Sequence, residues 1–219
     1  SDGTFRVNMS RMQIHNACDP FEVTRAEIEG RDQMLDIMAL LRRAIPGCEN
    51  AELVASASML GVRESRRIQG DFVLRGEDIK ACKQFEDNIF IAGNSVDMHG
   101  NGSSVRYEPA KGGAYGVPYR ILLPAKVKNL LVAGRASSMD RVVLAAIRVM
   151  PPVFAMGQAA GTAAALALRV KTSLSDIPVP ELQKMLIADG VLLEEGGYGE
   201  KGEKSIDSHV HAEGPVIEE

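Results

Sequence analysis

Apolar residues recur along this chain with two different periods, and the changes of period divide it into helical and extended segments. The longest helical pattern follows Thr24, which forms a T-x-x-E capping box with Glu27. Apolar side chains then recur at helical spacing until Pro46, so we predict a helix over residues 25–44. Further helical segments are expected over residues 77–85, 140–170 and 178–188. Extended segments are expected over residues 4–14, 51–59, 88–97, 117–124 and 129–135.

Two segments near the end of the chain carry further information. Residues 129–135, with the sequence NLLVAGR, form a continuous apolar run, which is typical of a fully buried strand in a parallel or mixed sheet. Residues 196–219 are polar, charged and aperiodic, so we expect them to form a disordered tail. The alternation of strand and helix patterns as a whole predicts an α/β fold.

The stretch over residues 150–168 contains no charged side chain and is long enough to cross a membrane. It is rich in Ala and Gly, contains Gln158 and opens with two prolines, so we interpret it as a buried helix instead. Its small residues share one helical face, namely Gly157, Ala160, Gly161 and Ala164. Such a face allows either a sheet or a cofactor to approach closely, and the pattern alone favours the two about equally.

The composition of the chain argues against two classes of function, nucleic-acid binding and the binding of zinc or an iron–sulfur cluster. The formal net charge is -4, aromatic residues make up 5% of the chain and Trp is absent, which argues against a nucleic-acid partner. The three cysteines, at positions 18, 48 and 82, form no C-x-x-C pair, which argues against a zinc or iron–sulfur site. Unpaired thiols are typical of a reducing compartment, so a cytoplasmic location is favoured. The sequence contains no recognisable N-terminal targeting signal from which the location could be judged directly.

Two polar clusters are candidates for chemistry. Asp97 and His99 alternate onto one face of a strand end, and an Asp that orients a His is a common general-base arrangement; the alternative is a turn histidine without a special role. Arg66 belongs to a group of three arginines around Glu64. That group is suited to an anionic substrate, but a structural ion-pair network with Glu64 and Asp71 is slightly favoured.

Three segments together resemble one family. They are GVRESRRIQGDFVL at 61–74, YGVPYRILLPAKVKNLLVAGRASS at 115–138 and IRVMPPVFAMGQAAGTAAAL at 147–166. They resemble the C-terminal half of FAD-dependent oxidoreductases that are often labelled similar to heterodisulfide reductase A, over about residues 20–190. The resemblance implies a mixed substrate-domain sheet plus the last strand and helix of a Rossmann-like FAD domain. It also implies FAD as cofactor and transfer of hydride or electrons to or from a small substrate.

The resemblance also implies site residues. On the flavin side these are Gly134, Arg135, Arg148, Met150, Gly157 and Gly161. On the substrate side they are Asp97, His99, Arg66 and Tyr119. For Gly134 a plain turn remains an alternative, and for Arg148 a salt bridge that anchors a loop. Residues 1–124 would then belong to the substrate domain and residues 125–195 to the FAD domain.

One part of the family pattern is missing from the sequence. A G-x-G-x-x-G turn between a strand and a helix normally holds the pyrophosphate of FAD. Gly100-Asn101-Gly102 precedes no apolar helix and Gly112-Gly113 leads into a strand, so neither fits. We therefore expect a C-terminal portion whose N-terminal half comes from the same gene or a second chain, with a homo-oligomer also open and no membrane partner. The rival interpretations are a flavin-free α/β binding domain and a non-catalytic partner subunit.

Overall fold

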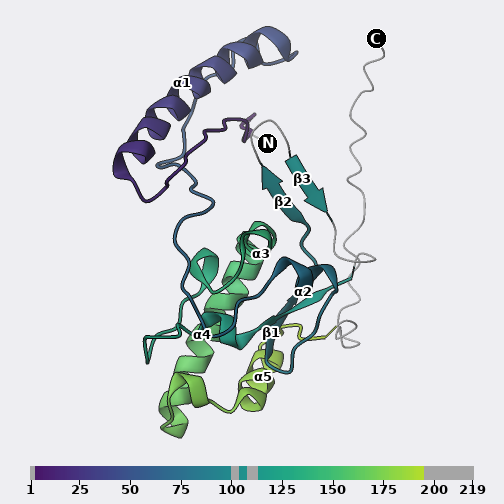
Figure 1. Cartoon of the computed structure of the whole chain (residues 1–219). Helices are drawn as coiled ribbons and strands as arrows, with labels where there is room; N and C mark the ends of the chain where they lie inside the picture. Colours follow the sequence, from purple (N-terminus) through teal and green to yellow (C-terminus); the bar gives the residue numbers. More distant parts are fainter. Residues whose placement is uncertain (1–2, 100–103, 108–112, 195–219) are drawn as a thin grey trace, which may run out of the picture.

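The computed structural model describes residues 3–99, 104–107 and 113–194 (Figure 1). The tail predicted over 196–219 lies outside these residues. The α-helices are α1 (Pro20–Ala44), α2 (Gly76–Lys80), α3 (Arg141–Ile147), α4 (Met150–Val170) and α5 (Val179–Ala188). The strands are β1 (Asn88–Ala92), β2 (Val96–His99), β3 (Ser104–Tyr107) and β4 (Tyr115–Pro118). Short 3-10 turns cover Tyr119–Leu122, Gly134–Ala136 and Leu174–Asp176.

Helix α1 confirms the long predicted helix but begins one turn earlier than its capping pattern indicated. The carboxylate of Asp19 accepts the N–H of Phe21 at 2.9 Å, and Pro20 occupies the first helical turn, where a missing N–H costs nothing. Thr24 therefore lies inside the helix, with its hydroxyl donating to the C=O of Pro20 at 2.8 Å. The predicted end at Ala44 is confirmed.

Figure 1 shows α1 standing apart from the part of the molecule that contains α2, α3, α4, α5 and the β1–β4 pair, which we call the lower body. Only Ala26 and Leu41 of this helix are buried, and the buried core begins at Leu74 and ends at Leu186. The segments over 4–14 and 51–59 that lead to and from α1 contain no strand, so the two strand predictions there are wrong. Most of their residues are exposed, and a strand without a neighbouring strand to receive its backbone hydrogen bonds is not stable.

The described strands form two antiparallel pairs rather than one mixed sheet. Strand β1 pairs with β4, with Phe90 opposite Val117, and β2 pairs with β3, with Asp97 opposite Arg106. The predicted extended segment over 88–97 is thus confirmed but is divided into two strands. The segment predicted over 117–124 ends as a strand at Pro118 and continues as a 3-10 turn.

The predicted buried strand over 129–135 is wrong. The segment is irregular, Leu130 is 43% exposed and the N–H of Val132 donates to the C=O of Leu122 at 2.9 Å. A buried parallel strand needs a strand on each side to pair its backbone, and the described residues place none beside this segment. The mixed α/β character of the fold is confirmed, whereas a Rossmann-like strand at this position is not observed.

Helix α4 forms the centre of the lower body. Its buried face packs against β1 and α5 and consists of Pro152, Met156, Ala159, Ala163, Leu166 and Ala167. Among the described residues α4 is the one helix whose length and apolar composition would suffice to cross a membrane. Its completely buried Met156, Ala159 and Ala163 instead form part of the core, as expected for a core helix.

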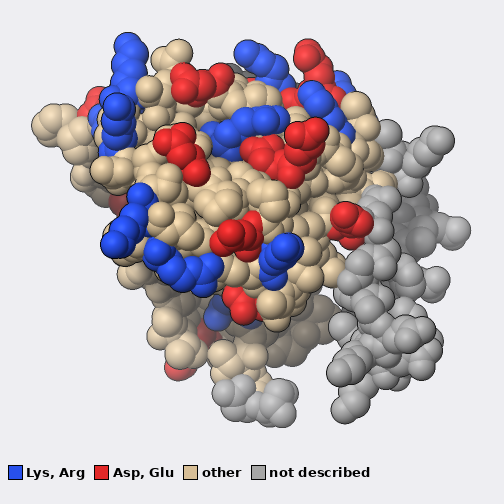
Figure 2. Space-filling model, turned by 90° about the horizontal axis from the view of Figure 1, so that it is seen from below, with Lys and Arg blue, Asp and Glu red and all other residues tan. Residues whose placement is uncertain are grey.

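The surface of the molecule carries both signs of charge. Figure 2 shows acidic and basic side chains interleaved on the face seen from below, with uncharged residues between them. This distribution offers no single-signed field on that face, of the kind that a nucleic-acid backbone attracts.

Candidate active site

The segment over 61–74 runs alongside residues 134–140 and brings two of the three family-like segments together. The N–H of Ile68 donates to the C=O of Ala136 at 2.8 Å, and that of Leu74 donates to the C=O of Ser138 at 3.2 Å. The buried hydroxyl of Ser138 donates to the C=O of Phe72 at 2.7 Å and accepts the N–H of Gly70 at 3.1 Å. These bonds fix the arginine-rich start of the segment beside the turn at Gly134.

Gly134 occupies a tight turn against the third segment. Its φ is +80°, a conformation that favours glycine, and a Cβ at this position would lie 3.5 Å from a methyl group of Val153 in the first turn of α4. The hydroxyl of Ser137 closes the turn by donating to the C=O of Val132 at 2.7 Å. Arg135 points outward, and its guanidinium donates to the C=O of Val62. The turn is therefore tied to α4 on one side and to the arginine-rich segment on the other.

The N-terminus of α4 is exposed and has an unusual set of donors. Val149 is the N-cap and provides no side-chain cap, and Met150 is 70% exposed. Pro151 and Pro152 carry no N–H, so Val149 and Met150 supply the backbone donors at this end. The first turn contains no acidic side chain to offset the positive end of the helix dipole.

The face of α4 opposite the core is open. Gly157 and Gly161 are exposed, and a Cβ added to either would have no described heavy atom within 4 Å. On the same side of the helix Phe154 is 68% exposed and Leu168 is 81% exposed. The small-residue face predicted from the sequence is therefore exposed, and no described strand packs on it; the buried face of α4 is the opposite one.

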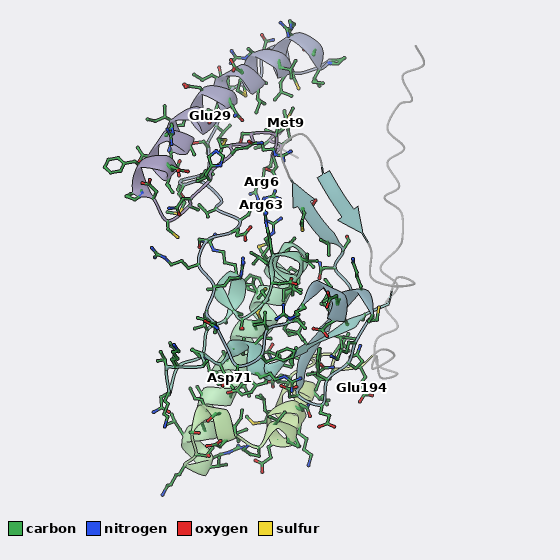
Figure 3. All side chains as sticks on the ribbon, in the orientation of Figure 1. Arg6, Met9, Glu29, Arg63, Asp71 and Glu194 are labelled. Atoms are coloured by element: carbon green, nitrogen blue, oxygen red, sulfur yellow. The ribbon has the colours of Figure 1, made fainter. Side chains whose placement is uncertain are left out.

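A cluster of arginines links the 61–74 segment to α3 and to strand β2. Arg63 reaches Asp97 with 3.8 Å between Nη1 and Oδ2, and Nη2 of Arg148 donates to the backbone C=O of Asp97 at 3.1 Å. Figure 3 shows Arg63 on the side of the lower body that faces the N-terminal segment, whereas Asp71 lies far below it. The ion pairs of this arginine group involve Glu64, as one interpretation predicted, and Asp97 in place of Asp71.

Glu64 holds the second half of this cluster together. It pairs with Arg67 at 2.7 Å and with Arg141 at 3.0 Å, one oxygen to each. Both pairs are partly exposed, so each contributes at most about 1 kcal/mol to stability. Their main effect is positional, because they join the 61–74 segment to the first residue of α3.

Arg148 is the most perturbed cation of the cluster. Desolvation lowers the pKa of its guanidinium, the nearby Arg63 lowers it further, and Asp97 and Glu64 act in the opposite direction. Its Nε is buried and has no hydrogen-bond acceptor among the described residues. Arg148 thus combines an anchoring contact to the backbone of β2 with a buried donor that has no described acceptor.

The remaining predicted substrate residues separate from one another. Arg66 is exposed and lines a pocket of about 410 Å³ together with Cys18, which precedes α1, and with Pro20 and Val23 in the first turn of α1. Tyr119 is 2% exposed, and its hydroxyl donates to the C=O of Leu174 at 2.8 Å inside the lower body. Burial raises the pKa of Tyr119 well above its ordinary value. His99 is the last residue of β2, opposite Ser104, and its side chain lies outside the described part of the structure.

Asp140 is a structural residue of the site that the sequence reasoning did not single out. Its Oδ1 accepts the N–H of Val143 and caps α3, while its Oδ2 accepts the N–H of Gly76 in α2, both at 2.8 Å. The signal was present in the sequence, because an Asp directly before an apolar helical run is a typical N-cap. Its second bond joins residues 64 positions apart and has no sequence signature.

Comparison with known proteins agrees with these features. The family model described as FAD dependent oxidoreductase matches residues 2–186. No curated protein matches the chain, and no solved structure matches it. Since the match covers most of the sequence, the chain belongs to the FAD-dependent oxidoreductase family, whose cofactor is FAD.

Proposed function

We propose that this chain is the C-terminal part of a flavoprotein oxidoreductase of the kind that resembles heterodisulfide reductase A. It would contribute one side of the flavin site and part of the substrate site. Bound FAD would supply the two-electron chemistry, while the chain's residues bind, orient and exclude water. The phosphate-binding half would come from a segment encoded by the same gene or from a second chain.

The observation that carries this proposal is the open glycine face of α4. A glycine inside a helix costs about 1 kcal/mol relative to Ala, and α4 contains two of them. Neither Gly157 nor Gly161 has a described neighbour that a Cβ would meet, so the fold described here does not require them. A planar group that lies flat on this face would require both.

The residues fit one side of the cofactor. The turn at Gly134 brings backbone close to the first turn of α4, and the N–H groups of Val149 and Met150 suit the negative charge of a reduced flavin ring. Arg148 precedes these two donors in the chain and can reinforce them. The described residues contain no glycine-rich turn between a strand and a helix, so the pyrophosphate needs donors from elsewhere.

On the substrate side we propose that Asp97 orients His99 as a general base. The contacts of Asp97 with Arg63 and Arg148 support a defined position for its strand. Arg66 opens onto its own pocket and remains a candidate for contact with the substrate. Tyr119, which we also proposed for this side, would need to leave its bond to Leu174 before it could contact a ligand.

The experiment is a pair of measurements on Gly157→Leu. In this chain alone the substitution should raise the free energy of unfolding by up to about 1 kcal/mol, because Leu favours a helix more than Gly does. In the protein extended by its upstream coding segment, which should purify with bound flavin, the same change should abolish flavin binding. Gly93→Leu is the matched control, since Gly93 is an exposed glycine with no neighbour within 4 Å. The proposal is contradicted if the extended protein binds no flavin, or if its Gly157→Leu variant still binds flavin. Either result favours a flavin-free binding domain.

A further inference from the structure

The arginine cluster has more positive charge than its own carboxylates can balance. Within the described residues it joins four guanidinium groups to the two carboxylates of Glu64 and Asp97. The guanidinium groups belong to Arg63, Arg67, Arg141 and Arg148. Arginine keeps its charge at all ordinary pH values, so deprotonation cannot relieve this excess.

The excess is concentrated at Arg148. Each of the other three arginines has a carboxylate within 4 Å, whereas Arg148 contacts Asp97 through the backbone C=O. Its Nε is buried without an acceptor, and a buried donor left unpaired is costly to a fold. Arg63 contacts the carboxylate of Asp97 and Arg148 contacts its backbone C=O, so two like charges lie near the same residue, and Arg63 lowers the pKa of Arg148. An oxyanion bound between the two guanidinium groups would reduce this repulsion.

The surroundings of Arg148 favour the same ligand. Arg148 is directly followed by the N-terminus of α4, whose N–H groups at Val149 and Met150 we assign to the flavin ring, so a carboxylate held by the guanidinium groups would lie next to the flavin. Arg63 and Arg141 remain 53% and 66% exposed at their side chains, so both can turn toward an arriving ligand. The excess of positive charge and the exposed guanidinium groups of Arg63 and Arg141 together favour a small anion as the ligand.

We propose that this cluster, centred on Arg148 and Arg63, binds the carboxylate group of a small organic acid. The guanidinium fork matches a planar carboxylate with two parallel hydrogen bonds. This inference deepens the proposed function by assigning the substrate to a chemical class. The identification of the bound acid as the substrate rests on the proposed function. Binding of the carboxylate itself requires no flavin. With Arg148 holding the carboxylate, the remaining part of the organic acid would lie beside Asp97 and the uncovered start of α4.

Binding is tested on the purified chain with succinate as the carboxylate probe and inorganic phosphate as the second probe. Calorimetric titrations are run at constant ionic strength, with NaCl replacing the probe, so that general screening does not contribute. We expect saturable binding of succinate, and we expect Arg148→Gln to weaken it at least about tenfold. Arg63→Gln should also weaken it, and Arg148→Lys should restore only part of the affinity because Lys lacks the fork.

Arg169→Gln is the matched control, because Arg169 is an exposed arginine of α4 that pairs with Glu181 away from the cluster. Its succinate affinity should equal that of the unmodified chain, and circular dichroism should show each variant folded. Three results would overturn the proposal: no saturable succinate binding, unchanged affinity in Arg148→Gln, or saturation by phosphate alone. The last would assign the cluster to a phosphate group such as that of the cofactor. Failure of the flavin experiment on Gly157→Leu would leave all of these outcomes unaffected.

Discussion

Replacing Asp140 by Ala should destabilise the lower body more than the loss of a helix cap alone. The carboxylate uses both oxygens on backbone N–H groups, one in α3 and one in α2. Both bonds are 2.8 Å long, within the range of charge-assisted hydrogen bonds. The substitution therefore removes an N-cap and a tertiary contact together.

The size of the effect follows from these two bonds. Loss of an Asp N-cap costs about 1 kcal/mol. The N–H of buried Gly76 would be left without its acceptor, and an unpaired buried donor adds about 1–3 kcal/mol. We expect a total loss of roughly 2–4 kcal/mol in the free energy of unfolding, a large share of the 5–15 kcal/mol typical of a domain.

Urea denaturation followed by circular dichroism measures this loss, with Asp140→Ser and Asp140→Asn as graded controls. Ser can still cap α3 but cannot also reach α2, so Asp140→Ser should lie between Ala and the unmodified chain. Asn keeps one carbonyl oxygen and should behave similarly. The reasoning is refuted if Asp140→Ala changes stability by less than about 0.5 kcal/mol, the range of an ordinary surface substitution. It is equally refuted if Asp140→Ser and Asp140→Ala lower the free energy of unfolding by the same amount.

Three further predictions concern other parts of the lower body. Tyr119→Phe should cost about 1 kcal/mol near neutral pH because the C=O of Leu174 loses its donor. Above pH about 10 the unmodified chain should lose stability as the phenol ionises in the unfolded state but stays protonated when folded, and urea curves of Tyr119→Phe should lack that contribution. Gly134→Ala should cost about 1–3 kcal/mol in the same assay because its φ is +80°, and a neutral result would show that the turn relaxes. Sedimentation velocity should detect self-association through the open face of α4, at least tenfold weaker in Phe154→Ser/Leu168→Ser, and an unchanged distribution would exclude this face as the contact.

The helices were predictable because their signals are local. The helices predicted over 25–44, 140–170 and 178–188 follow from apolar spacing and from punctuation by Pro, and the structure contains each helical region. It divides the region over 140–170 into α3 and α4, and it ends the helix predicted over 77–85 at Lys80. The error at the start of α1 came from preferring the T-x-x-E pattern of Thr24 over Asp19-Pro20. Asp followed by Pro is the stronger signal, because it combines a side-chain acceptor with a first-turn residue that needs none.

The strands were less predictable because a strand depends on its neighbours. The run at 129–135 has the composition of a buried parallel strand, but composition provides no partner. In the structure its backbone pairs with the 3-10 turn at Tyr119–Leu122 through Val132 instead. Likewise the alternation of Asp97 and His99 placed both in one strand correctly, but the sequence could not show that Tyr119 would be buried with its hydroxyl bonded to the C=O of Leu174.

Helix α3 explains how a site so rich in like charges keeps its shape. Five of its residues, from Val143 to Ile147, are buried, so packing in the core fixes the position of α3. The contacts among the charged residues are not needed to hold the helix in place. Asp140 anchors its start to α2, and Arg148 extends from its end to the backbone of β2. The Arg63 side chain is half exposed and can move, whereas α3 holds Arg148 at a fixed position in the cluster. A cation that is fixed before its ligand arrives needs no reorganisation on binding, and this is the property that the proposed carboxylate site would use.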